Sequence, residues 1–127
     1  MSLFEKKILI VDEVAFSRVC SAILELEGYR AAAITSVDNL EARLDGEEFG
    51  LIITSYPYGA FFFKEIGKRR IPIIILSDHI NRDLVDVLEG FNHYYCMIKP
   101  LDYLKFRSLV KRVMDGEQAM NGGYNIV

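Results

Sequence analysis

The sequence lacks the features that mark membrane, secreted and nucleic-acid-binding proteins. No stretch approaches the roughly 18 apolar residues of a membrane-spanning helix. The apolar run at residues 8–11 stops at an acidic pair and is too short for a secretory leader. The 15 basic residues are outnumbered by 18 acidic ones, so the chain has no basic footprint for direct nucleic-acid binding. We therefore expect a cytoplasmic protein that binds neither membrane nor nucleic acid.

Cysteine is scarce, with only Cys20 and Cys96. Cys20 falls on the apolar face of a predicted helix, and Cys96 falls within an apolar strand. Free thiols of intracellular proteins commonly serve as small hydrophobic residues. We expect both to be core residues and not redox or metal-binding groups.

What remains is the composition of a folded domain, because 51% of the residues are hydrophobic and 26% are charged. A chain of 127 residues has room for one core. We predict one domain over residues 1–115 and a tail or linker over residues 116–127, where Asn-Gly-Gly occurs without any periodic pattern.

Apolar runs and helical patterns alternate along the chain. Strands are predicted at residues 7–11, 29–35, 50–55, 71–77 and 94–98. Helices are predicted over about residues 14–27, 60–69 and 101–115, with two more from the apolar faces Val37, Leu40, Leu44 and Leu84, Val87, Leu88, Phe91. Gly28 should end the first helix in a left-handed conformation, and Ser36 should cap the second. Five strand–helix units predict a parallel sheet covered by helices on both faces.

In such a sheet the working site lies beyond the carboxyl ends of the strands. The strong strands end in Asp12-Glu13, Thr54-Ser55, Ser77 and Lys99-Pro100. Paired carboxylates can hold a Mg²⁺ ion, and a lysine with a hydroxyl can bind a phosphoryl group. The sequence thus predicts carboxylate, hydroxyl and ammonium groups together at one edge.

These strand ends resemble those of response-regulator receiver domains, the CheY-like superfamily. KKILIVDE is similar to the first strand and acidic pair of that family, FGLIITS to the third strand, PIIILS to the fourth and MIKP to the fifth. The resemblance covers about residues 5–115. It implies an α/β, flavodoxin-like three-layer αβα sandwich with a five-stranded parallel sheet of strand order 2-1-3-4-5.

The resemblance also assigns roles at the strand ends. Asp12 and Glu13 match the acidic pair that holds the metal, and Ser77 matches the hydroxyl that turns toward the phosphoryl group. Lys99 matches the conserved ammonium, and the proline after it often follows a cis bond. We expect Lys99 to pair with Asp12 or Glu13.

The phosphoacceptor position of the family falls on Ser55, or on Thr54 if the register slips by one. An acyl phosphate cannot form on a serine, and a neutral hydroxyl removes one of the charges that hold the metal. The resemblance therefore implies a degenerate receiver with no required cofactor and a weakened, empty or near-empty Mg²⁺ site. Transfer of the acceptor role to an acidic residue is a minor alternative.

Two further departures accompany this one. Pro57 and Gly59 come early after the acceptor position, so the third helix should be short or irregular. Cys96 occupies the position of the family's switch aromatic, with Tyr94 and Tyr95 just before it. The parts that make and sense a phosphoryl group are mostly lost.

Two local patterns are open to more than one interpretation. The three adjacent aromatics Phe61 to Phe63 cannot all face one core from a regular helix, so the segment is irregular or exposes a ring as a partner surface. The basic cluster Lys68 to Arg70 is interpreted as a solvated helix end, with docking of an acidic partner as the minor alternative.

The leading hypothesis is a phosphorylation-independent receiver-like module of two-component signalling. It would act by protein contact or as a homodimer through residues 81–115, with an output domain or a histidine kinase as further partners. One alternative is a phosphorelay receiver that accepts phosphate at an atypical residue. Another is a small-ligand-binding flavodoxin-like module, although no glycine-rich phosphate loop follows the first strand. The sequence contains no visible set of nucleophile, base and acid, so we do not expect an enzyme.

Overall fold

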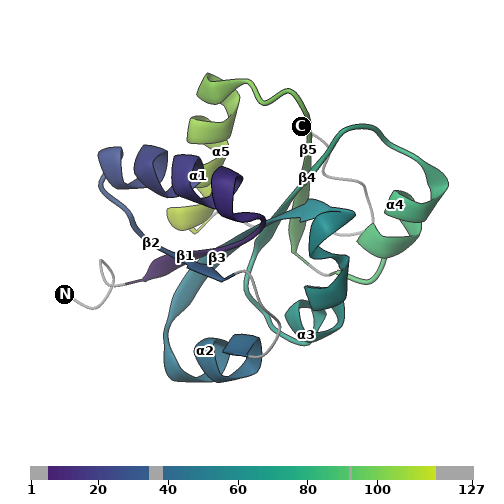
Figure 1. Ribbon diagram of the computed structural model, residues 1–127, viewed down its shortest axis with the longest axis horizontal. Coiled ribbons are helices and arrows are strands. Elements are labelled where there is room, and N and C mark those ends of the chain that lie inside the picture. Colours follow the sequence, from purple (N-terminus) through teal and green to yellow (C-terminus); the bar gives the residue numbers. More distant parts are fainter. Residues whose placement is uncertain (1–5, 35–38, 92, 117–127) are drawn as a thin grey trace.

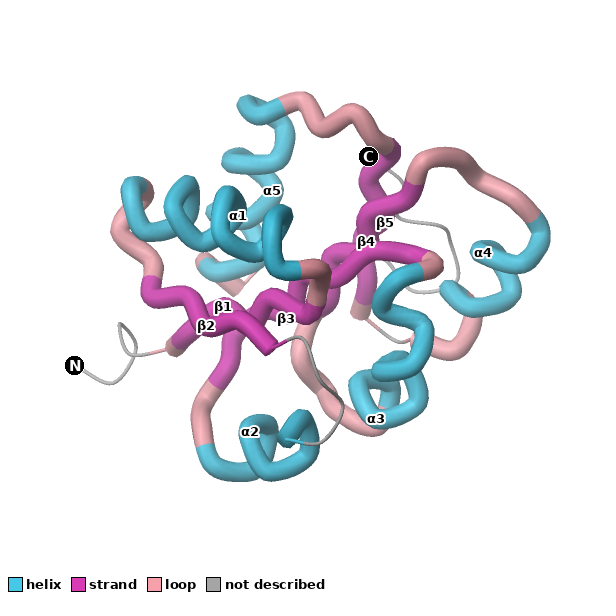
Figure 2. Tube along the Cα trace, in the orientation of Figure 1, coloured by secondary structure: helices cyan, strands magenta, loops and turns pink. Residues whose placement is uncertain are grey.

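The computed structural model describes residues 6–34, 39–91 and 93–116, which form a parallel sheet covered by helices on both faces (Figures 1 and 2). The strands are β1 (Lys7–Val11), β2 (Arg30–Ile34), β3 (Phe49–Tyr56), β4 (Ile73–Ser77) and β5 (Tyr94–Ile98). The helices are α1 (Val14–Leu26), α2 (Leu40–Gly46), α3 (Phe63–Gly67), α4 (Arg82–Leu88) and α5 (Tyr103–Met114), with a 3-10 helix, η3 (Tyr58–Phe62), before α3. The strand order β2-β1-β3-β4-β5 confirms the predicted fold class.

The core has two halves, one on each face of the sheet. Successive side chains of a strand point to opposite faces. Ile8 and Ile10 therefore pack with side chains of α1 and α5, whereas Leu9 and Val11 pack with those of α2, α3 and α4. Figure 1 shows α1 and α5 on one side of the sheet and α2 and α3 on the other. A strand that is apolar on both faces belongs in the middle of such a sandwich.

The strands predicted at residues 7–11 and 94–98 have the predicted bounds, and the other predicted ranges differ from the structure by one or two residues at their ends. Gly28 follows α1 with a φ of +95°, which confirms the left-handed end of the helix. The predicted cap at Ser36 and the tail beyond residue 116 lie outside the described residues. Among the described residues, no helix is long and apolar enough to cross a membrane.

The segment after β3 is irregular, as predicted. It forms η3 and then a five-residue α3 instead of one regular helix. Phe61 exposes 87% of its surface, whereas Phe62 is buried. Phe63 lies between two other rings, stacked on Tyr56 at 6.3 Å and edge-on to Phe91 at 5.6 Å between centroids. The three adjacent aromatics therefore have three different environments.

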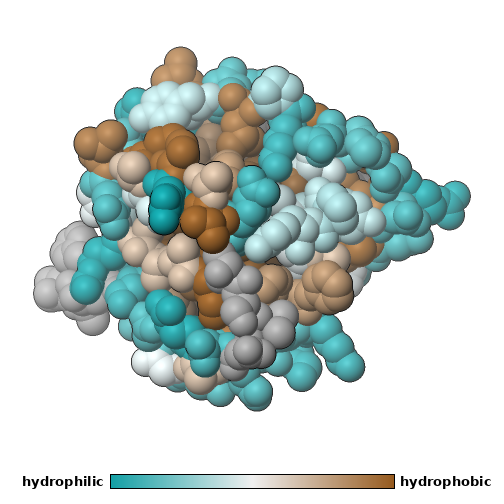
Figure 3. All heavy atoms as spheres, viewed as in Figure 1, coloured by the Kyte–Doolittle hydropathy of each residue, from teal (hydrophilic) through white to brown (hydrophobic). Residues whose placement is uncertain are grey.

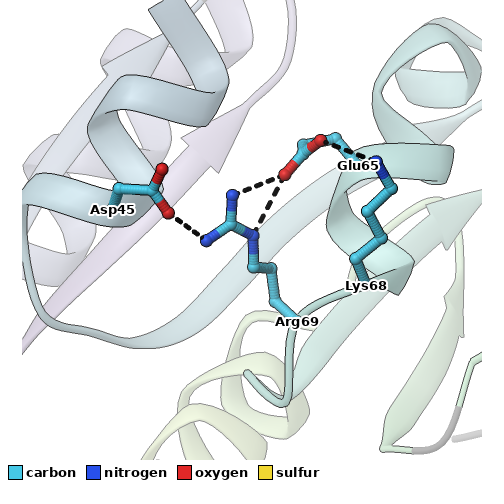
Figure 4. A network of polar contacts seen from close by, with 4 residues as sticks. All are labelled: Asp45, Glu65, Lys68 and Arg69. Carbon is cyan, nitrogen blue, oxygen red and sulfur yellow. Dashed lines mark hydrogen bonds and ion pairs between the residues drawn. The ribbon is translucent and has the colours of Figure 1, made fainter.

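Arg69, directly after α3, joins α3 to α2 (Figure 4). Its guanidinium lies 2.5 Å from Oδ1 of Asp45 and donates to Oε2 of Glu65 at 2.5 and 3.1 Å. Nζ of Lys68 lies 3.5 Å from the other oxygen of Glu65. The hydrogen bonds from Arg69 are the main cause that holds the pKa of Glu65 below its ordinary value. The basic cluster is thus more than a solvated helix end, because Arg69 connects two helices.

Replacing Arg69 with leucine is expected to lower the free energy of unfolding more at neutral pH than in acid. Because folding lowers the pKa of Glu65, its contribution is fully present above the unfolded pKa, about 4.3. It is lost as the pH falls through the lower folded pKa. Urea denaturation of wild type and Arg69→Leu at about pH 7 and about pH 3 measures the two differences. The exposed neighbour Arg70→Leu is the control, and equal differences at both pH values would contradict the prediction.

Candidate functional site

The parallel register brings the predicted strand ends to one edge of the sheet. Thr54 lies beside Val11, Tyr56 beside Ser77, and Ser77 beside Ile98. The residues that follow or end these strands therefore lie in one row across β1, β3, β4 and β5. Among the described residues, five polar side chains are buried, and all of them lie at this edge: Asp12, Ser17, Thr54, Ser55 and Ser77.

Asp12 and Ser55 form the centre of this site. The hydroxyl of Ser55 donates a short hydrogen bond to Oδ2 of Asp12. The other carboxylate oxygen, Oδ1, accepts from the backbone N–H of Glu13 at 2.8 Å. Asp12 is only 2% exposed, and a buried carboxylate needs such partners to remain in the fold. Ser55 therefore satisfies the buried carboxylate of Asp12 from the position that matches the phosphoacceptor, where receiver domains have a third acid.

The acidic pair is divided between two environments. Asp12 is buried, whereas Glu13 is exposed and occupies the position before the first residue of α1. Mg²⁺ requires several oxygen ligands in near-octahedral geometry. Both oxygens of Asp12 already accept hydrogen bonds, and the third position carries the neutral hydroxyl of Ser55. This donor set, as it stands, does not fit a Mg²⁺ ion.

Thr54 has a structural role, because its side chain joins two strands of the sheet. Its hydroxyl donates to the backbone carbonyl of Val11 at 2.7 Å, across from β3 to β1. Gly59 of η3 packs directly on it, since a Cβ atom at Gly59 would lie 1.9 Å from Oγ1 of Thr54. The register alternative, in which Thr54 takes the acceptor position, has no support from this geometry.

The hydroxyl of Ser77 is engaged by the loop before α4. It donates to the backbone carbonyl of His79 at 2.8 Å. Two residues further on, Oδ1 of Asn81 accepts from the backbone N–H of Leu84 at 2.8 Å and caps α4. Ser77 thus stabilises the entry to α4 from the edge of the site.

The prediction that Lys99 forms an ion pair with Asp12 or Glu13 is wrong. No contact within 4.0 Å between Nζ of Lys99 and either Asp12 or Glu13 is found in the described part of the chain. Nζ lies instead 5.7 Å from the centroid of the Phe16 ring, where a cation is attracted to the face of the ring. The peptide bond between Lys99 and Pro100 is cis.

Cys96 and the two tyrosines before it are interior residues. Cys96 is fully buried, and burial raises the pKa of its thiol. Tyr94 and Tyr95 are also buried, on opposite faces of β5. Burial, with a smaller effect of Asp12, raises the pKa of Cys20 to about 12. The expectation that both cysteines are core residues is confirmed.

Two residues at this edge were not predicted from the sequence. The hydroxyl of Ser17 donates to the backbone carbonyl of Asp12 at 3.2 Å, and Phe16 holds Lys99 as described. Both lie in the first turn of α1, immediately after the acidic pair. That adjacency is the signal in the sequence that could have identified them.

Solved structures with the same fold are found in several organisms. A CheY-like response regulator receiver domain protein from Methanospirillum hungatei is 21% identical with a TM-score of 0.72, and the match covers 87% of this chain and 94% of that one. A response regulator from Thermotoga maritima is 16% identical with a TM-score of 0.72, covering 87% and 98%. The beryllofluoride-activated NtrC4 receiver domain dimer is 22% identical with a TM-score of 0.69, covering 86% and 96%.

No protein-family model and no curated protein matches the chain. At such identities a structural likeness shows the fold and leaves the activity to be argued from the site. The chain has the fold of response-regulator receiver domains.

Proposed function

We propose that this chain is a non-catalytic, receiver-like signalling module that works by protein contact without being phosphorylated. The observation that carries the proposal is the hydrogen bond from the hydroxyl of Ser55 to the buried carboxylate of Asp12. In a phosphoacceptor site this position needs a free carboxylate beside a bound metal. Here a neutral side chain is committed to keeping Asp12 satisfied.

The other polar groups at the edge support the same proposal. The hydroxyl of Ser77 is bonded to the carbonyl of His79, and the ammonium of Lys99 lies over the ring of Phe16. Each of these groups has a local partner that stabilises one arrangement of the site. A site whose buried carboxylate and hydroxyl groups are engaged within the fold has no need of an added phosphoryl group to reach a single state.

Contact with partners is proposed for residues 81–115, which include α4, β5 and α5. Leu104, at the start of α5, is 68% exposed, and the neighbouring Tyr103 is also exposed. Exposed large apolar side chains on one helix are typical of protein contact surfaces. The occupant proposed for this surface is an output domain, a histidine kinase or a second receiver.

Incubation with acetyl phosphate and Mg²⁺ is expected to leave the wild-type protein unmodified. Intact-mass measurement checks this directly, with an aspartate-bearing receiver domain as the positive control. The matched variants are Ser55→Ala and Asp12→Asn. Stoichiometric, base-labile phosphate on the wild type would contradict the proposal. Labelling that Ser55→Ala abolishes and Asp12→Asn retains would establish the alternative of an atypical phosphoacceptor.

A further inference from the structure

The outward face of α1 carries apolar side chains that no other part of the described chain covers. The exposed apolar residues on this face, which we call the α1 stripe, are Ala15, Val19, Ala22 and Leu26. Their spacing of four, three and four residues places them in one line along the helix. Val19 is 60% exposed and Leu26 is 84% exposed. Figure 3 shows hydrophobic atoms gathered at the upper left, over α1.

The stripe is an addition to the core face of α1 and not part of it. Cys20 and Leu24 are buried against the sheet and α5. A helix that packs on a sheet needs one apolar face, with polar residues on the opposite one. Leucine and valine on the outer face therefore indicate a second packing partner.

Two opposite charges flank the α1 stripe on one side. Arg18 and Glu25 are both exposed, and neither has an ion pair within the described residues. They are two turns apart, a rise of about 10 Å, so they cannot pair with each other. Beside them a hollow of about 410 Å³ separates α1 from Ala33 of the edge strand β2, with Arg18 and Glu25 on its helical wall.

We propose that the α1 stripe binds the α1 stripe of a second copy of this chain, with the two helices antiparallel. A two-fold axis between Val19 and Ala22 sets Leu26 against the partner's Ala15 and Val19 against the partner's Ala22. Each large side chain then meets a small one, which lets the two helices approach each other closely. A parallel pair would set leucine against leucine and leave alanine against alanine.

The charges select the same arrangement. In the antiparallel pair Arg18 lies opposite the partner's Glu25, and the symmetry produces this contact twice. In a parallel pair the two-fold axis places the two copies of Arg18 on opposite sides of the contact, so neither Arg18 meets the partner's Glu25. Size and charge complementarity thus favour one occupant, a second copy, in one orientation.

The contact is small, so the dimer is weak. Interfaces below about 1,200 Å² are typical of transient association, and we expect a Kd of roughly 10–100 μM. The α1 stripe shares no residue with the range 81–115, so this inference goes beyond the proposed function and does not depend on the absence of phosphorylation.

Sedimentation equilibrium over a concentration series tests the contact. Arg18→Glu and Glu25→Arg are each expected to raise the dimer Kd about tenfold or more, because each places like charges opposite one another twice. The double variant Arg18→Glu/Glu25→Arg restores the opposite charges and should return the Kd to near the wild-type value. A merely structural effect of either substitution would not be reversed by the other.

A second pair of variants separates the two surfaces. Leu26→Asp should abolish the dimer, whereas Leu104→Asp on α5 should leave it intact. If the wild type stays monomeric at several hundred micromolar, about tenfold above the expected Kd, the inference is overturned. It is also overturned if Leu104→Asp, and not Leu26→Asp, disrupts the dimer, and that result would leave the proposed function standing. If a different protein covers the α1 stripe and a second copy does not, the proposal that a second copy binds there is overturned.

Discussion

Replacing Gly59 with alanine is expected to lower the free energy of unfolding by about 3 kcal/mol, at the upper end of the usual effect of overpacking. A Cβ atom at this position would lie 1.9 Å from Oγ1 and 3.2 Å from Cβ of Thr54. Thr54 cannot move away freely, because its hydroxyl is bonded to the carbonyl of Val11 at 2.7 Å in the buried centre of the sheet. Thermal unfolding should show a melting temperature lower by roughly 10 °C.

Gly46→Ala is the matched control for this prediction. Gly46 lies at the end of α2, and a Cβ atom there would meet nothing within 4 Å. Alanine in a helix is more favourable than glycine, so this variant should be as stable as the wild type or slightly more stable. Equal melting temperatures for the Gly59 and Gly46 variants would show that the contact with Thr54 is not tight.

A double-mutant cycle identifies the atom responsible. Thr54→Ala removes Oγ1, so the combination Gly59→Ala/Thr54→Ala should be less destabilised than the sum of the two single variants. The difference between the summed losses of the two single variants and the loss of the double variant measures the energy of the clash between Gly59→Ala and Oγ1 of Thr54. Additive effects would place the strain of Gly59→Ala elsewhere in η3.

The close contact at Gly59 lies within the short segment after β3. The chain turns back over the end of β3 at once, and Gly59 allows its backbone to lie on Thr54. In the receiver family this loop borders the phosphoacceptor. Here Gly59 of this loop packs on Thr54, the neighbour of Ser55 in the chain. Ser55 and Asp12 are both buried.

Much of the fold could be predicted because the relevant signals are local. The β-branched runs at residues 8–11 and 73–76 can only be central strands, and Gly28 marks the end of a helix by its conformational freedom. The irregular third helix followed from the early Pro57 and Gly59 and from three aromatics in a row. In each case the cause lies within a few residues of the effect.

The partners of the polar groups at the site could not be predicted in the same way. Charge alone favoured a pair between Lys99 and the acids, yet the ammonium lies over Phe16. Asp12 was already satisfied by Ser55 and by the N–H of Glu13, so it gained little from a further partner. Such competition between partners depends on three-dimensional packing, which spacing along the chain does not contain.

Restoring a carboxylate with Ser55→Asp is expected to destabilise the protein in the absence of metal by about 2–4 kcal/mol. The new side chain replaces a donor with an acceptor, so Asp12 would lose the hydrogen bond from Ser55 and face a second negative charge while only 2% exposed. Like charges in one buried site oppose ionisation of the pair. Thermal and urea unfolding in the presence of a chelator measure this loss.

Ser55→Asn separates the charge from the shape of the new side chain. Asparagine has nearly the same size as aspartate but no charge, so its loss of stability should be smaller. Because like charges in one buried site repel, the extra loss of stability of Ser55→Asp is present at neutral pH, where both carboxylates carry a charge. It should shrink as protonation removes one charge on lowering the pH. If Ser55→Asp and Ser55→Asn lose the same stability at neutral pH and again in acid, the effect is one of packing and not of charge.

Millimolar Mg²⁺ then distinguishes a lost metal site from one that was never compatible with this fold. The cation would bind between Asp12 and the new carboxylate and stabilise the folded state by mass action. We expect Mg²⁺ to raise the melting temperature of Ser55→Asp by several degrees, and to leave the wild type and Ser55→Asn unchanged. Stabilisation of the wild type would mean that Ser55 and Asp12 separate to admit the ion, and the proposal of a module independent of phosphorylation would lose its main support. If only the aspartate variant responds, one substitution at Ser55 accounts for the loss of the metal site, and the rest of that edge still has the geometry of a receiver.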